Sequence, residues 1–161
     1  MFGGALMGQA RELLDTARAR NIRIVTAESC TGGLIAGLLT EIPGSSDVVE
    51  RGFITYSDDA KRESLGVPAD LLRKHGAVSE EVARAMAEGA LRHSHAQLAI
   101  AVTGIAGPGG GSAEKPVGLV YVAVADAHGT SAHEYRFGDI GRTEVRLSTV
   151  EEALLLLRAR L

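Results

Sequence analysis

The sequence contains a single cysteine, Cys30, and no tryptophan. One cysteine cannot form an intramolecular disulfide, and this usage fits a protein of the reducing cytoplasm. No apolar run approaches the ~20 residues that a transmembrane helix needs, so no membrane association is expected. The N-terminal stretch MFGGALMGQARELLD becomes charged too early for a secretory signal peptide.

Positive charge is not in excess, because the formal net charge at pH 7 is -3. The chain therefore has no basic footprint for nucleic acid, and no nucleic-acid partner is expected. The five histidines show no metal-ligand spacing with acidic residues or with Cys30, so neither a metal nor another cofactor is expected. A chain of 161 residues that is 45% hydrophobic suits one domain, spanning residues 1–161.

The order of apolar patterns predicts an α/β fold. Strands are expected over 22–27, 48–56, 98–103, 117–125 and 131–137, with the last two forming a hairpin. Helices are expected over 5–20, 32–40, 58–65, 79–93 and from about 141 to the C-terminus, and Pro68 is expected to open a turn. Early alternation of strands and helices, followed by a hairpin, predicts a three-layer α/β/α sandwich with a mixed sheet.

The heptapeptide AESCTGG, residues 27–33, lies between a predicted strand and a predicted helix. One interpretation is capping, in which Ser29 or Thr31 accepts a hydrogen bond from the start of helix 32–40. The other is a nucleophile at the positive end of a helix, where free N–H groups stabilise an oxyanion. Cys30 is a second possible nucleophile, although a lone cysteine after a buried strand is more often part of the core. Adjacent residues at a strand end point in opposite directions, so only one of Ser29 and Cys30 should face a cleft.

The stretch TYSDDAK, residues 55–61, predicts a helix start with Ser57 as the N-cap. Tyr56 and Lys61 then occupy the two positions that meet in a hydrophobic staple. A phenol and an amine are a poor staple but a plausible pair for handling protons, because desolvation lowers the pKa of a lysine. The alternative is an exposed lysine on a charged helix.

The glycine-rich stretch TGIAGPGGG, residues 103–111, predicts a loop whose backbone N–H groups approach an anion, typically phosphate. It lacks the GxxxxGK pattern and is therefore no P-loop. Thr103 directly follows a predicted buried strand, and Ser45 and Ser46 follow a turn. Arg142, at the start of the last helix, could clamp a phosphate together with the N–H groups of that helix.

Taken together, AESCTGG, GSSDVVERGFITYSDDAK, HGAVSEE and TGIAGPGGG…EKPVG resemble the CinA C-terminal family over nearly the whole chain. Its enzymatic members are nicotinamide-nucleotide amidohydrolases, which deamidate nicotinamide mononucleotide (NMN) to nicotinate mononucleotide and ammonia. The resemblance implies an α/β/α fold and a homodimer. Longer members carry an additional N-terminal domain that is similar to nucleotide pyrophosphatases.

The resemblance also implies roles for individual residues. Ser29, Tyr56 and Lys61 match the catalytic positions of the family. The substrate is expected to contact Thr31, Gly32, Ser45, Ser46, Thr103, Gly104, Gly109, Gly110, Gly111 and Arg142.

The expected mechanism is of the Ser–Lys type. Lys61, helped by Tyr56, takes the proton of Ser29, and N–H groups at the start of helix 32–40 hold the oxyanion. Two alternatives are a regulatory nucleotide-binding module without catalysis and a thiol amidase that acts through Cys30.

Overall fold

The structure is a computed structural model that describes all residues from Met1 to Leu161. Its helices are α1 (Gly4–Ala19), α2 (Leu34–Thr40), α3 (Asp58–Leu65), α4 (Ala69–His75), α5 (Glu80–Arg92) and α6 (Arg142–Ala159), with a 3₁₀ turn η1 at Ser45–Asp47. Its strands are β1 (Ile24–Glu28), β2 (Val49–Ile54), β3 (Leu98–Gly104), β4 (Leu119–Asp126) and β5 (Gly129–Arg136). They form one sheet in the order β2-β1-β3-β4-β5.

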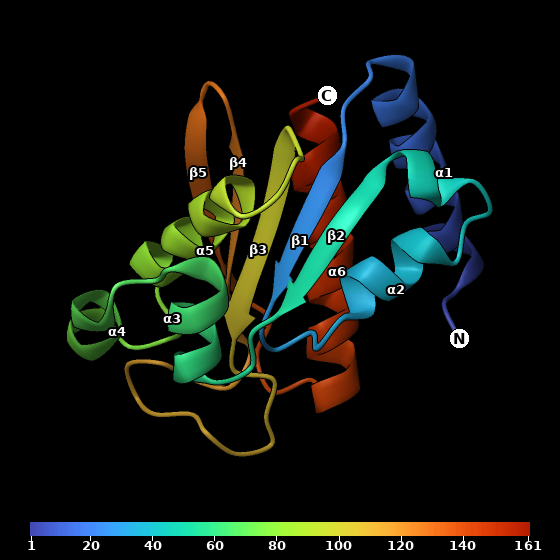
Figure 1. Cartoon of the computed structure of the whole chain (residues 1–161). Coiled ribbons are helices and arrows are strands. Elements are labelled where there is room, and N and C mark those ends of the chain that lie inside the picture. The colour runs from blue at the N-terminus through green and yellow to red at the C-terminus, as the bar shows by residue number, and fades with distance from the viewer.

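The sheet is mixed. Strands β2, β1 and β3 run parallel, whereas β4 is antiparallel to both β3 and β5. Helices α1, α2 and α6 cover one face, and α3, α4 and α5 cover the other (Figure 1). The predicted three-layer α/β/α sandwich with a mixed sheet is therefore confirmed.

Successive side chains of β3 point alternately into the two hydrophobic cores, one on each face of the sheet. Ile100 and Val102 pack into the layer with α1, α2 and α6, whereas Ala99 and Ala101 face the layer with α5. Strand residues alternate between the two faces of a sheet, so one strand serves both layers. The small side chains of Ala99 and Ala101 let α5 lie close to the sheet, and α5 in turn packs against the end of α3. A Cβ atom at Gly89 of α5 would lie 2.0 Å from the Leu65 carbonyl oxygen, so only glycine permits this approach.

Most predicted elements are present, with two differences. Ser57 and Ser79 are the N-caps of α3 and α5, and each hydroxyl accepts a hydrogen bond from the backbone, so the N-cap predicted at Ser57 is confirmed. The segment after Pro68 is a helix, α4, and not only a turn. Helix α2 begins at Leu34, two residues later than predicted, because Gly32 and Gly33 adopt left-handed conformations with φ values of +58° and +100°.

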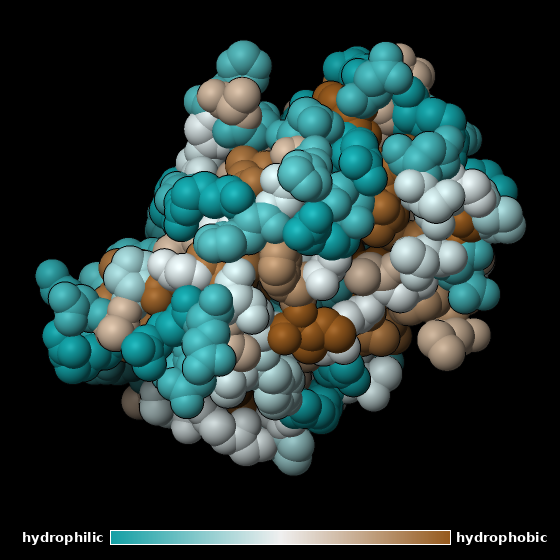
Figure 2. Space-filling view, viewed as in Figure 1, coloured by the Kyte–Doolittle hydropathy of each residue, from teal (hydrophilic) through white to brown (hydrophobic).

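The parallel strands carry their following residues to the same edge of the sheet. Ser29 follows β1, Thr55 and Tyr56 follow β2, and the glycine-rich loop follows β3. Ligands of open α/β sheets bind at this carboxyl edge. The visible surface is mostly hydrophilic with scattered apolar residues (Figure 2). None of the helices combines the length and apolar character that crossing a membrane requires.

Candidate active site

Ser29 lies in the first turn after β1. Its backbone N–H donates to the Val102 carbonyl of β3 at 3.1 Å, so the neighbouring strand holds the residue in place. The residue is only 8% exposed, and it lines a pocket of about 290 Å³ at the carboxyl edge of the sheet. A hydroxyl at this position can meet a ligand while it remains shielded from bulk water.

The start of α2 is capped by a carboxylate that sequence reasoning did not identify. Glu28 is fully buried, and its two oxygens accept from the N–H groups of Gly33, Ile35 and Ala36 and from the Thr31 hydroxyl. These donor–acceptor distances lie between 2.6 and 3.2 Å.

This arrangement corrects two expectations. Neither Ser29 nor Thr31 caps the helix, because Glu28 already accepts its first N–H groups. The same N–H groups cannot form the predicted oxyanion hole, since they have no free hydrogen to offer. Ser29 is thereby released from a capping role.

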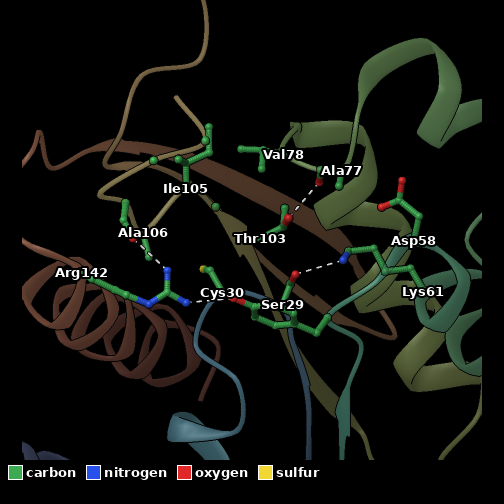
Figure 3. A pocket seen from close by; sticks show the side chains of 15 residues that line it. Ser29, Cys30, Asp58, Lys61, Ala77, Val78, Thr103, Ile105, Ala106 and Arg142 are labelled. Carbon is green, nitrogen blue, oxygen red and sulfur yellow. Dashed lines mark hydrogen bonds between the residues drawn. The ribbon is translucent and has the colours of Figure 1, made fainter. Parts of the chain in front are cut away.

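Lys61 forms a hydrogen bond with the Ser29 side chain. Its Nζ lies 3.0 Å from Ser29 Oγ (Figure 3). The same nitrogen lies 2.8 Å from the Thr55 carbonyl oxygen. Lys61 is only 1% exposed, so the interpretation of this residue as a solvated surface lysine is wrong. The Thr55 carbonyl orients the amine, because it accepts one N–H while the same nitrogen contacts Ser29.

Burial also changes the acidity of this amine. Desolvation lowers the pKa of Lys61 below its ordinary value, against the opposing influence of the negative charge of Asp58. A lysine with a lowered pKa is neutral over a wider pH range and can accept a proton there. Position and acidity therefore both suit Lys61 to act as a base toward Ser29.

Cys30 is placed less favourably for nucleophilic chemistry. It also lines the pocket, so the expectation that only one of Ser29 and Cys30 faces the cleft is wrong. Burial, however, raises the pKa of its thiol to about 12. The thiolate is the reactive form of cysteine, and it is therefore scarce at neutral pH. Of the two adjacent residues, Ser29 is the one that contacts a base.

Arg142 forms the opposite side of the pocket from Lys61, with Ser29 between them (Figure 3). Its guanidinium donates to the Gly107 carbonyl and to the Tyr56 hydroxyl, each at 2.9 Å. No carboxylate forms an ion pair with it. An oriented guanidinium without an acidic partner, beside a glycine-rich loop, is suited to an anionic group such as phosphate.

Tyr56 lies at the same end of the pocket as Arg142, the end suited to bind an anion. It is 61% exposed, and its hydroxyl bonds to Arg142 and not to Lys61. The expectation that Tyr56 assists Lys61 therefore needs correction, because the phenol extends toward α6 while the amine is buried under Thr55. Tyr56 orients Arg142 instead.

The pocket brings together most, but not all, of the predicted site residues. Those that line it are Ser29, Tyr56, Lys61, Thr103, Gly104, Gly109, Gly110 and Arg142. The Thr103 hydroxyl donates to the Ala77 carbonyl at 2.8 Å and fixes the segment between α4 and α5, which forms one wall.

Other predicted contacts do not line this pocket, namely Thr31, Gly32, Ser45, Ser46 and Gly111. Thr31 is buried and bonds to Glu28. Ser45 and Ser46 precede β2, beside the amino end of β1, and therefore lie at the opposite edge of the sheet. Their expected contact with the substrate is corrected on this ground.

The fold and the site together define the class of protein: a three-layer α/β/α domain with a buried serine–lysine pair at the carboxyl edge of its mixed sheet. Comparison with known proteins identifies the family. The CinA C-terminal domain matches residues 7–161, and the chain belongs to this family.

Individual relatives agree with this assignment. A CinA-like protein of an Anaeromyxobacter species is 52% identical over 100% of this chain, and one of Geobacter sulfurreducens is 49% identical over 99%. In both comparisons this chain spans only 40% of the relative's length. The crystal structure of the competence/damage inducible protein CihA from Agrobacterium tumefaciens superposes with a TM-score of 0.97 at 57% identity, covering 99% of this chain and 97% of that one. The CinA superfamily protein of Escherichia coli has a TM-score of 0.93 at 32% identity, over 100% and 94% of the two chains.

Proposed function

We propose that the protein is an amidohydrolase that deamidates nicotinamide mononucleotide to nicotinate mononucleotide and ammonia. The observation that carries the proposal is the 3.0 Å contact between Lys61 Nζ and Ser29 Oγ. This contact lies inside a pocket whose far side holds Arg142, which has no acidic partner. A nucleophile–base pair within hydrogen-bond reach is the basic requirement of acyl transfer. The resemblance to NMN deamidases supplies the substrate.

In the first step, neutral Lys61 takes the hydroxyl proton as Ser29 Oγ bonds to the carboxamide carbon. The electron pair of the C=O bond moves to oxygen, and a tetrahedral oxyanion results. The N–H group of Cys30, directly after the nucleophile, has no acceptor on the backbone of another residue and is our choice as a donor to this oxyanion.

In the second step, the C–N bond breaks and Lys61 returns its proton to the departing nitrogen. Ammonia leaves, and a nicotinoyl ester of Ser29 remains. Water then attacks this ester with Lys61 again as the base. Breakage of the ester bond regenerates Ser29 and releases the carboxylic acid product.

The phosphate of the substrate is assigned to Arg142, to the N–H groups of the glycine-rich loop and to the Tyr56 hydroxyl. This end of the pocket carries positive charge without an acidic partner, whereas the reacting carboxamide has no net charge. Binding at a distance from the reacting bond contributes mainly to affinity and to orientation. The dephosphorylated riboside should therefore be a poor substrate.

Two other functions have less support from the site. A thiol amidase through Cys30 is disfavoured because burial raises the pKa of the thiol to about 12. A regulatory nucleotide-binding module would use the Arg142 end of the pocket but has no need for a buried lysine against Ser29. The contact between Lys61 and Ser29 is the specific observation that favours catalysis.

The test is ammonia release by the purified protein from nicotinamide, its riboside and its mononucleotide, with Ser29→Ala as the control. Release from the mononucleotide alone, lost in the variant, is the expected result. Binding of the mononucleotide without ammonia release would instead favour the regulatory module. A homodimer and a cytoplasmic location stay predictions, and sedimentation velocity tests the first of them.

A further inference from the structure

The turn that carries Ser29 is held by hydrogen bonds on nearly all its polar groups. Gly32 N–H donates to the Ser29 carbonyl at 3.0 Å, and Leu34 N–H donates to the Thr31 carbonyl at 3.1 Å. Glu28 fixes the other side of the turn through the contacts described above. Within the turn, the backbone N–H groups of Cys30 and Thr31 donate to no backbone carbonyl.

A distant arginine completes this network. Arg146, in the second turn of α6, donates through Nε to the Cys30 carbonyl at 3.1 Å and through Nη2 to the Thr31 carbonyl at 3.0 Å. No carboxylate forms an ion pair with this guanidinium. Both of its hydrogen bonds go to carbonyl groups of the turn after Ser29.

The packing around Gly32 points to the same contact. Gly32 adopts φ of +58°, and a Cβ atom there would lie 3.4 Å from Arg146 Nη2. A glycine both permits this left-handed conformation and leaves space for the guanidinium. The expected role of Gly32 in substrate binding is thereby replaced by one in seating Arg146.

We infer that Arg146 is a positioning residue that fixes the turn after Ser29 and thereby keeps the Cys30 N–H, the proposed oxyanion donor, aimed at the pocket. A guanidinium bound to the Cys30 and Thr31 carbonyls fixes the two peptide groups that follow the Cys30 N–H and so restricts rotation of the Cys30 backbone. This inference rests on the proposed function, because it supplies the support of the proposed oxyanion donor.

Lysine cannot replace this arginine fully. The planar guanidinium reaches two adjacent carbonyls with two nitrogens in a fixed fork, whereas an ammonium offers its hydrogens from a single atom. Arg146 also lies outside the residues that line the pocket, unlike Arg142. Its loss should therefore change the rate of the chemical step and leave substrate affinity nearly unchanged.

The experiment compares Arg146→Met and Arg146→Lys with Arg158→Met. Arg158 lies on the same helix and pairs with Glu12 at the surface, so it serves as the matched control. For each protein, kcat and KM for NMN are measured together with the melting temperature. Hydrogen–deuterium exchange of the 29–34 segment reports on the turn without any need for activity.

The expected result for Arg146→Met is a kcat lowered by about 10- to 100-fold, less than the ~10²–10³ typical of deleting an oxyanion donor itself, with KM within about threefold. Exchange should accelerate in the 29–34 segment, and Arg146→Lys should fall between the wild type and Arg146→Met. Arg158→Met should match the wild type in all of these. If Arg146→Met does not fold, Arg146→Lys decides by the same measurements.

Unchanged exchange in the 29–34 segment of folded Arg146 variants would overturn the inference, whatever their activity. An unchanged kcat despite faster exchange would also overturn it, because the turn would then not matter for the reaction. If the wild type releases no ammonia, the proposed function fails by itself, and the role of Arg146 as the aid to catalysis fails with it. Exchange still shows in that case whether Arg146 holds the turn, so the two failures are told apart.

Discussion

Replacing Lys61 by methionine is the sharpest test of the proposed chemistry. Methionine has a similar length and no charge, so it fits the buried site but cannot accept a proton from Ser29. Loss of a positioned general base costs about 10²–10⁴-fold in rate. We therefore expect kcat for NMN to fall by that factor, while KM stays nearly the same because the phosphate end of the pocket is unchanged.

The effect on stability should be small enough to keep the variant folded. The substitution leaves the buried Thr55 carbonyl without its donor, which costs about 1–3 kcal/mol. Relief of the desolvation of the amine offsets part of this cost. A domain of this size loses about 2–4 °C in melting temperature per kcal/mol, so the decrease should not exceed about 12 °C.

The pH dependence of the rate separates a base from a simple positive charge. Only the neutral amine can take the Ser29 proton, so the rate should rise with pH through the pKa of Lys61. Because desolvation lowers that pKa, the midpoint should lie below the ordinary lysine value. Lys61→Arg keeps the charge but cannot lose a proton, and it should be nearly inactive. Its larger side chain costs about 1–3 kcal/mol in a filled site, so methionine is the cleaner substitution.

The assay is ammonia release from NMN between pH 6 and 10, with melting curves for every variant. Lys74→Met is the control, since Lys74 is an exposed lysine of α4. A folded Lys61→Met enzyme that keeps more than a tenth of the wild-type rate, with the same pH profile, would refute the assignment of Lys61 as the base. An active Lys61→Arg enzyme would leave the residue only an electrostatic role.

Four further predictions can be checked with the same assay. Ser29→Ala should abolish ammonia release while Cys30→Ala keeps most of it, and loss only in the cysteine variant would contradict the serine mechanism. Arg142→Ala should raise KM for NMN by roughly 10- to 150-fold, the equivalent of about 1.5–3 kcal/mol for a charged hydrogen bond, with a smaller change in kcat. Asp58→Asn removes a charge that raises the pKa of Lys61, so the midpoint of the pH profile should move to lower pH; an upward shift would contradict this. Activity should persist in a chelator, and its restoration by added zinc or magnesium after loss would overturn the metal-free mechanism.

The fold could be predicted from the sequence because local patterns and the architecture agree. The buried strand over 98–103 and the serine cap of α3 are local features, and each is present as expected. Helix α4 was missed because a seven-residue segment after Pro68 is too short to show a helical period clearly. The late start of α2 depends on the left-handed conformations of Gly32 and Gly33. Glycine adopts both positive and negative φ, so the residue type alone does not predict which one occurs.

The site was predictable in its side chains but not in its hydrogen bonds. Ser29, Lys61 and Arg142 stand out because their residue types carry recognisable chemistry at strand and helix ends. Glu28 was overlooked because a cap is normally sought at the residue directly before the helix, whereas this carboxylate ends the preceding strand and reaches forward.

The partners that give these side chains their function are set by tertiary structure. The Thr55 carbonyl that orients Lys61 is a backbone group, which every residue possesses, so no sequence pattern marks it. Arg146 lies 116 positions after Cys30 and meets it only because α6 packs beside α2 on the same face of the sheet. A serine followed by a helix therefore indicates a nucleophile only when the fold supplies three additional contacts: a separate cap for the helix, a buried base, and a support for the turn. In this chain Glu28 caps the helix. The pH dependence of the rate tests Lys61 as the proposed base, and hydrogen–deuterium exchange tests Arg146 as the proposed support of the turn.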